Sequence, residues 1–364
     1  KSKAVWAALL TALTVLAVPT VMYLSGLLPY GPFTTGGFLL VVLAGAVVIA
    51  LAANTLRRVA PIAPPLAVAA LCLLVLLVDV VTGEHLQIDT VFGYSPIVAG
   101  RFAGYGNQAF ALVGICTLVV ATAGWELSER RRPGTPRSAR VAVLLTLFAV
   151  VVVLVGAPMW GSDVGGVLAA VPAFAVCALL LNERRVDLRT ATTIGVASVA
   201  VLGAFALLDL TRPEESRTHL GRFVESVLDG DALVILQRKL TTNLNILTST
   251  VWTFTIPVAL LFFAYITWRP NGLIRRIQDA HPSFRALGIS GLTLGIVAFA
   301  LNDSGIALPA MMLGIVLPYT AYLALGVLPA DGEVHRRSAS GSEPTLRSEV
   351  AGDDVPVAAE RGRE

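Results

Sequence analysis

The sequence predicts an all-α fold, a polytopic helical membrane protein with about ten transmembrane helices. Hydrophobic residues make up 55% of the 364 residues and charged residues only 14%, whereas a soluble globular protein carries about 25% charged residues. The apolar residues lie in runs of roughly 17 to 25 residues, the length that a helix needs to cross about 30 Å of hydrocarbon. We therefore expect a transmembrane helical domain over residues 1–328.

Ten apolar runs are long enough to be spans, and polar, basic or glycine-bearing segments separate them. Four runs precede the basic linker at 128–140 (SERRRPGTPRSAR), and six follow it. In chain order, we expect the spans at 4–28, 36–55, 64–82, 107–127, 141–158, 165–182, 191–210, 251–268, 286–302 and 305–327. No clear internal repeat relates them, so the pattern gives no support to a transporter built from inverted repeats.

The positions of the Lys and Arg residues orient these spans. The N-terminus and alternate connecting segments hold sixteen Lys and Arg residues, whereas the other connecting segments hold six. Basic loops are typical of the cytoplasmic side. We therefore expect a multi-pass protein of the plasma membrane with both termini in the cytoplasm.

Residues 329–364 are predicted to form a disordered cytoplasmic tail, because they are rich in Ser, Glu, Asp and Arg and have few large apolar residues. The net charge of +3 gives no indication of nucleic-acid binding. All three cysteines lie inside apolar runs without a CxxC spacing, so we expect buried thiols rather than disulfides or zinc ligands. Because the chain begins with Lys1 rather than Met, we expect it to be a piece of a longer protein.

Most of the unusual polar residues lie in the outer segments, of which the first is the loop at 83–106. Its five glycines allow backbone to approach a ligand closely. Arg101 lies close to the start of the fourth span, just before Asn107, and its guanidinium offers five N–H donors in a planar fork that fits phosphate or carboxylate. The alternative is a structured loop in which Arg101 caps carbonyl groups or pairs with Asp89.

Asp79 lies about one turn before the outer end of the third span. An ionisable side chain within a span usually faces the bundle interior, where Arg101, His85 or a lysine of another outer loop could be its partner. The alternative is a position at the level of the lipid headgroups, reached by water. Asp79 is one of two candidates for a catalytic base.

The second long outer loop, at 211–250, is predicted to contain two amphipathic helices on the membrane surface. The first has apolar residues at helical spacing on one face: Leu220, Phe223, Val224, Val227 and Leu228. The polar candidates for binding a lipid phosphate are His219 and Arg222 on one face, and Arg238, Lys239 and Asn243 in the second helix. The alternative is a surface helix whose basic side chains only reach toward headgroups.

The third outer feature is the four-residue turn Asn302-Asp303-Ser304-Gly305 between two apolar runs. The turn must lie at or inside the outer interface, because the apolar residues resume at Ile306. Asp303 is the second candidate for a base, or for a partner of an outer arginine, and Asn302 could donate hydrogen bonds to a ligand. Alternatively, Asp303 and Ser304 cap the final helix.

Sequence motifs of known catalysis are missing: the chain has no HExxH, no GxSxG and no P-loop spacing. The four histidines are scattered over both sides, which disfavours a metal site. We predict no metal and no cofactor, and the sequence leaves open whether the protein is an enzyme.

Several outer segments together resemble the multi-span membrane domain of actinobacterial envelope proteins that carry a domain similar to the alkaline phosphatase superfamily. The resemblance covers residues 5–328 and is carried by the residues from Asp79 to Gln87, from Gly93 to Asn107, from His219 to Val224, from Arg238 to Asn243 and from Leu301 to Gly305. It implies a phosphatase-like partner domain or subunit, whose metal site and nucleophile have no counterpart in this chain. A phosphatase-like domain outside the cell and joined at Lys1 would require an outer N-terminus, whereas the charge count favours a cytoplasmic one.

Three functions remain open at this point. The first is binding or processing of an anionic lipid or lipid-linked glycan at the outer leaflet, with the outer Arg and Lys side chains on phosphate. The second is a transporter or flippase, which should line a polar path through the bundle. The third is a membrane anchor or scaffold for the phosphatase-like partner.

Overall fold

The computed structural model describes residues 3–29, 33–88, 90–95, 104–213, 267–302 and 305–328, together with the single positions 237, 241, 258, 261, 264 and 265. Throughout these residues the regular elements are helices, apart from an isolated β-bridge between Ile88 and Tyr94. Residues Lys3–Leu328 belong to one compact unit. The predicted all-α class is confirmed for the part of the chain described.

Nine helices in the described ranges are long and apolar enough to cross a membrane. They are α1 (Lys3–Leu24, extended by the 3-10 turn Ser25–Leu27), α2 (Thr35–Asn54, extended by Thr55–Arg58), α3 (Ala63–Thr82), α5 (Asn107–Arg131), α6 (Arg137–Gly156), α7 (Val164–Leu181), α8 (Leu188–Leu210), α13 (Ser283–Leu301) and α14 (Ala307–Val327). A shorter helix, α12 (Gly272–Ala280), precedes α13. Nine expected spans agree with these helices to within about one turn, and the tenth, at 251–268, lies mostly outside the described residues.

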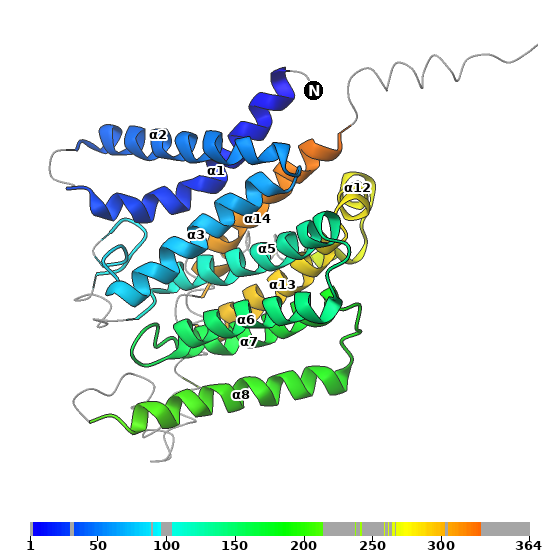
Figure 1. The fold of residues 1–364 in the computed structure, drawn as a ribbon. Coiled ribbons are helices and arrows are strands. Elements are labelled where there is room, and N and C mark those ends of the chain that lie inside the picture. The colour runs from blue at the N-terminus through cyan, green and yellow to red at the C-terminus, as the bar shows by residue number, and fades with distance from the viewer. Residues whose placement is uncertain are drawn as a thin grey trace, which may run out of the picture. The chain divides into compact units, whose positions relative to one another are not determined.

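Successive long helices run in alternate directions, so their connections collect at two ends of the bundle (Figure 1). The carboxylate end holds residues 83–88, 90–95, 104–106, 157–163, 211–213 and 302. The arginine end holds residues 55–62, 132–136, 182–187 and 269–282, and α1 begins and α14 ends there (Figure 1). Hydrogen bonds join connections within each end: Tyr105 N–H donates to Gly161 O over 2.8 Å at the first, and Arg137 donates to Leu181 O over 3.3 Å at the second.

Helix α8 ends at the carboxylate end, and α12 begins at the arginine end (Figure 1).

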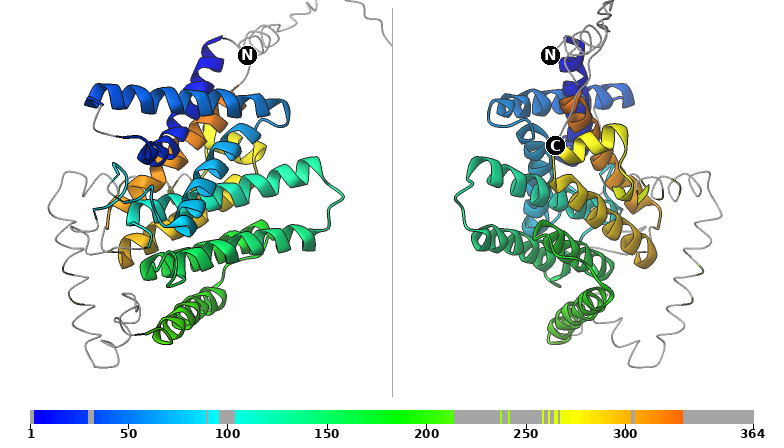
Figure 2. Two further views of the ribbon diagram at one scale, coloured as in Figure 1. Left: turned by 60° about the vertical axis from the view of Figure 1, so that its left-hand side comes forward. Right: turned by 90° about the vertical axis from the view of Figure 1, so that its right-hand side faces the viewer.

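Helix α5 is the centre of the packing, and most of its side chains are buried. It lies against α3, α6, α7, α13 and α14, and the two views in Figure 2 show the other helices around it. Gly114 makes one of these contacts possible, because a Cβ there would lie 2.8 Å from a methyl group of Leu294 on α13. Helix α8 packs mainly on α7 and keeps most of its apolar surface exposed, as expected of a helix that faces lipid.

Polar residues mark where several helices begin and end. The carboxylate oxygens of Asp163 and Asp187 accept hydrogen bonds from Gly166 N–H and Thr190 N–H, over 2.9 and 2.8 Å, and so cap α7 and α8. Gly83 ends α3 with φ 107°, a left-handed conformation that glycine adopts without strain. The caps at Gly83 and Asp163 place loops of the carboxylate end directly on helix termini, and the cap at Asp187 does the same at the arginine end.

Candidate functional site

The first part of the candidate site is Asp79 in the last turn of α3. This residue is 3% exposed. One carboxylate oxygen accepts a hydrogen bond from Leu86 N–H over 2.8 Å, and the other accepts one from the Gln87 side-chain amide over 3.0 Å. The carboxylate therefore folds the start of the loop back onto α3 and is buried beneath it.

The second part is the closure of the loop at 83–106. The Glu84 carboxylate accepts a hydrogen bond from Gly104 N–H over 2.6 Å, and Gln87 accepts one from Gly106 N–H over 3.1 Å. Tyr94 donates its hydroxyl to Gly104 O over 3.1 Å. The described arms of the loop, before residue 96 and after residue 103, are thus tied together.

Glu84 adopts φ 64°, which is unusual for a residue with a side chain. Such a conformation costs about 1–3 kcal/mol and persists where surrounding contacts hold it. The buried hydrogen bond to Gly104 is one of these contacts. Conformational strain is therefore held at the closure of the loop.

A second set of contacts joins this loop to the connection just before α7. Gly104 lies so close to Gly161 that a Cβ would be 2.4 Å from the Gly161 carbonyl oxygen. Tyr105 is fully buried and donates its hydroxyl to Leu76 O over 3.0 Å. Burial raises the pKa of the Tyr105 hydroxyl above its usual range, so this group stays protonated and remains a donor.

Two more acids lie buried at the same end. Asp209, in the last turn of α8, forms an ion pair with Arg212 over 3.3 Å, and Arg212 also donates to Pro158 O over 3.2 Å. Asp163 caps α7, and the side-chain amide of Asn302 comes within 3.3 Å of where a Cβ on Gly165 would lie. Loops from α3, α6, α8 and α13 therefore meet here around buried carboxylates.

Three of the residues predicted for the site lie within the described ranges. Asp79 and Asn302 are buried at the carboxylate end, and Asn107 is the first residue of α5 at the same end. The other predicted residues lie outside the described part of the chain: Arg101, His219, Arg222, Arg238, Lys239, Asn243 and Asp303.

Sequence reasoning missed Glu84, Gln87, Asp163 and Asp209. The signal for Asp163 was present, since an Asp directly before an apolar run is a typical N-cap. Glu84 and Gln87 follow the glycine that ends α3, but their partners lie about twenty residues further on, and no local pattern indicates that pairing.

A buried cluster at the arginine end also escaped the sequence analysis. Glu126 of α5 is 3% exposed, accepts a hydrogen bond from Ser283 Oγ over 2.7 Å and forms an ion pair with Arg130 over 2.8 Å. His281 Nδ1 lies 2.7 Å from the same carboxylate. Arg130 also donates to Ala280 O. This cluster fastens the connection between α12 and α13 to the end of α5.

Between the two ends, buried hydroxyl groups bond to their own helices. Thr117, Thr122 and Ser290 donate to the carbonyl oxygens four residues earlier, over 2.6, 2.7 and 2.6 Å. Hydroxyls engaged in this way satisfy themselves within one helix. These three hydroxyl groups are therefore satisfied within their own helices.

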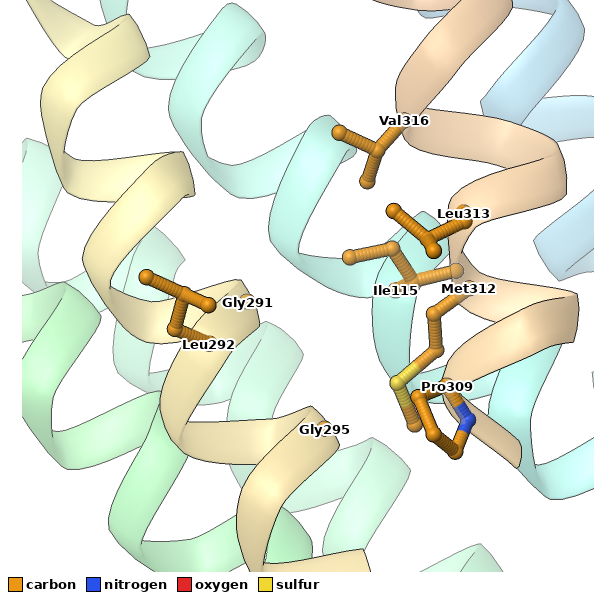
Figure 3. A pocket seen from close by; sticks show the side chains of 8 residues that line it. All are labelled: Ile115, Gly291, Leu292, Gly295, Pro309, Met312, Leu313 and Val316. Atoms are coloured by element: carbon orange, nitrogen blue, oxygen red, sulfur yellow. The ribbon is translucent and has the colours of Figure 1, made fainter. Parts of the chain in front are cut away.

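An apolar groove lies between α13 and α14, with Ile115 of α5 at its floor (Figure 3). Gly291 and Gly295 form one wall, and Pro309 and Met312 contribute to the other (Figure 3). All of its lining side chains are apolar, so the groove holds no group that could act as acid, base or nucleophile. Within the described ranges, no three His, Cys, Asp or Glu residues lie close enough to hold a metal ion.

Comparison with known proteins adds no assignment. No family model matches the chain. No curated protein and no solved structure matches it either.

Proposed function

We propose that this integral membrane domain binds a lipid-linked phosphate, such as a polyprenyl-phosphate glycan, at the outer leaflet through its carboxylate end. The observation that carries the proposal is the closed loop at 83–106, whose arms are held by Glu84 and Gln87. A loop fixed at both ends by buried hydrogen bonds loses less conformational entropy on binding than a free loop does. Arg101 belongs to the segment between these two fixed points.

The charge balance favours a local headgroup site over general attraction of anionic lipid. The segments expected on the outer side carry nine Asp and Glu residues against six Arg and Lys residues. A surplus of acids repels an anionic bilayer surface, so binding has to rest on direct contacts of arginine with phosphate. Asn, Tyr and carboxylate side chains in the same loops could bind sugar hydroxyls.

The carboxylate end is assigned to the outer leaflet on two grounds. The connections with sixteen Lys and Arg residues lie at the opposite end, and cytoplasmic loops are the basic ones. Both α1 and α14 have their free ends at that opposite end (Figure 1), which agrees with two cytoplasmic termini. Asp79 serves as loop support in this account, because both of its oxygens already accept hydrogen bonds.

The proposal is tested by adding polyprenyl phosphate to the detergent-solubilised protein and following its melting temperature. We expect the ligand to raise the melting temperature of the wild type and of Arg137→Ala, a variant of an arginine at the other end. We expect Arg101→Ala to lose that rise while melting like the wild type without ligand. An equal rise in Arg101→Ala would contradict the proposal, as would an equal effect of phosphatidylglycerol on the wild type.

A further inference from the structure

Helix α12 has one face buried in the bundle and one face exposed. Ile277 is fully buried, and Ile274 packs against the core. Leu273, Arg275 and Arg276 are exposed. A short helix with an apolar side against the bundle and arginines on the other side is typical of the boundary between protein, headgroups and water.

The segments that precede and follow α12 both anchor it to the bundle, so its exposed face is held in place. After α12, His281 and Ser283 contact the buried Glu126 carboxylate over 2.7 Å each. Before it, Thr267 is 3% exposed and packs against α13, where a Cβ on Gly288 would lie 2.9 Å from the Thr267 side chain. The arginines of α12 therefore project from a fixed element, which lowers the entropy lost on binding.

Two exposed aromatic side chains precede the helix. Tyr265 is 58% exposed and Trp268 is 59% exposed, and Arg269 follows directly. Tyr and Trp are enriched where a membrane protein meets the headgroup region. We call Tyr265, Trp268, Arg269, Leu273, Arg275 and Arg276 together the basic–aromatic face.

Three other arginines at the same end of the bundle are already bonded to the chain. Arg130, Arg137 and Arg140 each donate hydrogen bonds to carbonyl groups of the chain. Across the described residues, by contrast, the guanidinium groups of Arg269, Arg275 and Arg276 take part in no hydrogen bond or ion pair. Their donors remain open to a partner outside the chain.

We propose that the basic–aromatic face binds the headgroups of anionic phospholipids in the leaflet at the arginine end. The positive charge of three arginines complements the lipid phosphates, and the planar guanidinium donates two hydrogen bonds to one phosphate. Tyr265, Trp268 and Leu273 enter the boundary between headgroups and acyl chains. This site lies at the opposite end of the bundle from the one proposed for lipid-linked phosphate, and neither proposal depends on the other.

The test reconstitutes the full chain in phosphatidylcholine and adds brominated phosphatidylglycerol, which quenches nearby tryptophan fluorescence. The quenching gives the affinity for phosphatidylglycerol relative to phosphatidylcholine, and Trp268→Phe identifies the part of the signal that comes from Trp268. Each arginine near an anionic surface is worth roughly a fivefold change in affinity. We expect Arg275→Gln/Arg276→Gln to lower the relative affinity by up to about 30-fold.

Two matched variants complete the test. Arg275→Lys/Arg276→Lys keeps the charge and should retain most of the preference for phosphatidylglycerol over phosphatidylcholine. Arg184→Gln/Arg185→Gln removes two other arginines at the same end and should leave this preference unchanged. If both Gln pairs lower the preference equally, the effect comes from net charge and the proposal is overturned. It is also overturned if Arg275→Gln/Arg276→Gln binds phosphatidylglycerol as the wild type does.

Discussion

The carboxylate of Glu84 accepts a hydrogen bond from the backbone N–H of Gly104 over 2.6 Å, across twenty residues of chain. This one contact closes the loop whose middle segment carries Arg101. Glu84 itself has an unusual backbone conformation, with φ 64°. The proposed binding site therefore depends on a residue that makes no contact with the ligand in our account.

Substitution of Glu84 should open the loop without unfolding the bundle. Glu84→Ala leaves the Gly104 N–H without its acceptor, and an unsatisfied buried donor costs about 1–3 kcal/mol. We expect faster amide hydrogen exchange across residues 84–106 and unchanged exchange in α13, measured by mass spectrometry. Glu183→Ala, which alters an exposed carboxylate, is the control, and equal exchange in both variants would show that Glu84 does not hold the loop.

Gly104 should tolerate no side chain. It has φ 98°, and a Cβ would lie 2.4 Å from the Gly161 carbonyl oxygen. Strain in the backbone and this clash should together cost about 2–4 kcal/mol in Gly104→Ala, visible as a lower melting temperature. Gly124→Ala is the matched control, because a Cβ there meets no atom within 4 Å; similar melting of the two variants would mean that the contact with Gly161 is wrong.

Of the carboxylates at the arginine end, Glu126 should contribute most to the stability of the fold. Glu126→Ala removes the acceptor for Ser283 and Arg130 in a buried setting. Removing one partner of a buried charged cluster lowers the free energy of unfolding by about 3 kcal/mol, so we expect a marked loss of thermal stability. Glu129→Ala, on an exposed carboxylate 3.9 Å from Arg140, should change stability by less than about 1 kcal/mol, and equal losses would contradict the buried cluster.

Asp187 should make a small contribution to stability that disappears in acid. Hydrogen bonds from Thr190, first from its side chain and then from its backbone, hold the pKa of the Asp187 carboxyl below its usual range. A carboxyl with a lowered folded pKa stabilises the fold above its unfolded pKa of about 3.9, and the contribution is lost as pH falls through the folded pKa. Between about pH 5 and pH 2.5, the melting temperature should therefore fall less steeply with decreasing pH in Asp187→Asn than in the wild type. An identical pH dependence in the two proteins would exclude this role.

The sequence predicted the helices well because apolar length alone determines a span. The end of α3 at Thr82 and the start of α5 at Asn107 agree with the expected spans. Local reasoning also placed Asp79 near the outer end of its span, but it proposed Arg101, His85 or a lysine as partner. The structure pairs Asp79 with Leu86 N–H and Gln87, which lie in the loop that follows the same helix.

The remaining site contacts join residues that are distant in the sequence. Glu126 and His281 are separated by 155 residues, and neither stands in a pattern that marks a partner. Periodicity shows which face of a helix is apolar but not which helix it meets. The pairings within the buried clusters at both ends therefore could not be predicted from the sequence alone.

The central claim is that the closed loop at the carboxylate end binds a lipid-linked phosphate, and native mass spectrometry of the protein purified in mild detergent tests it most directly. We predict a discrete adduct with the mass of a polyprenyl-phosphate species on the wild type and on Arg137→Ala, and its loss on Arg101→Ala and Glu84→Ala. A wild-type spectrum without such an adduct after addition of polyprenyl phosphate, or an adduct that persists on Arg101→Ala, would contradict the claim.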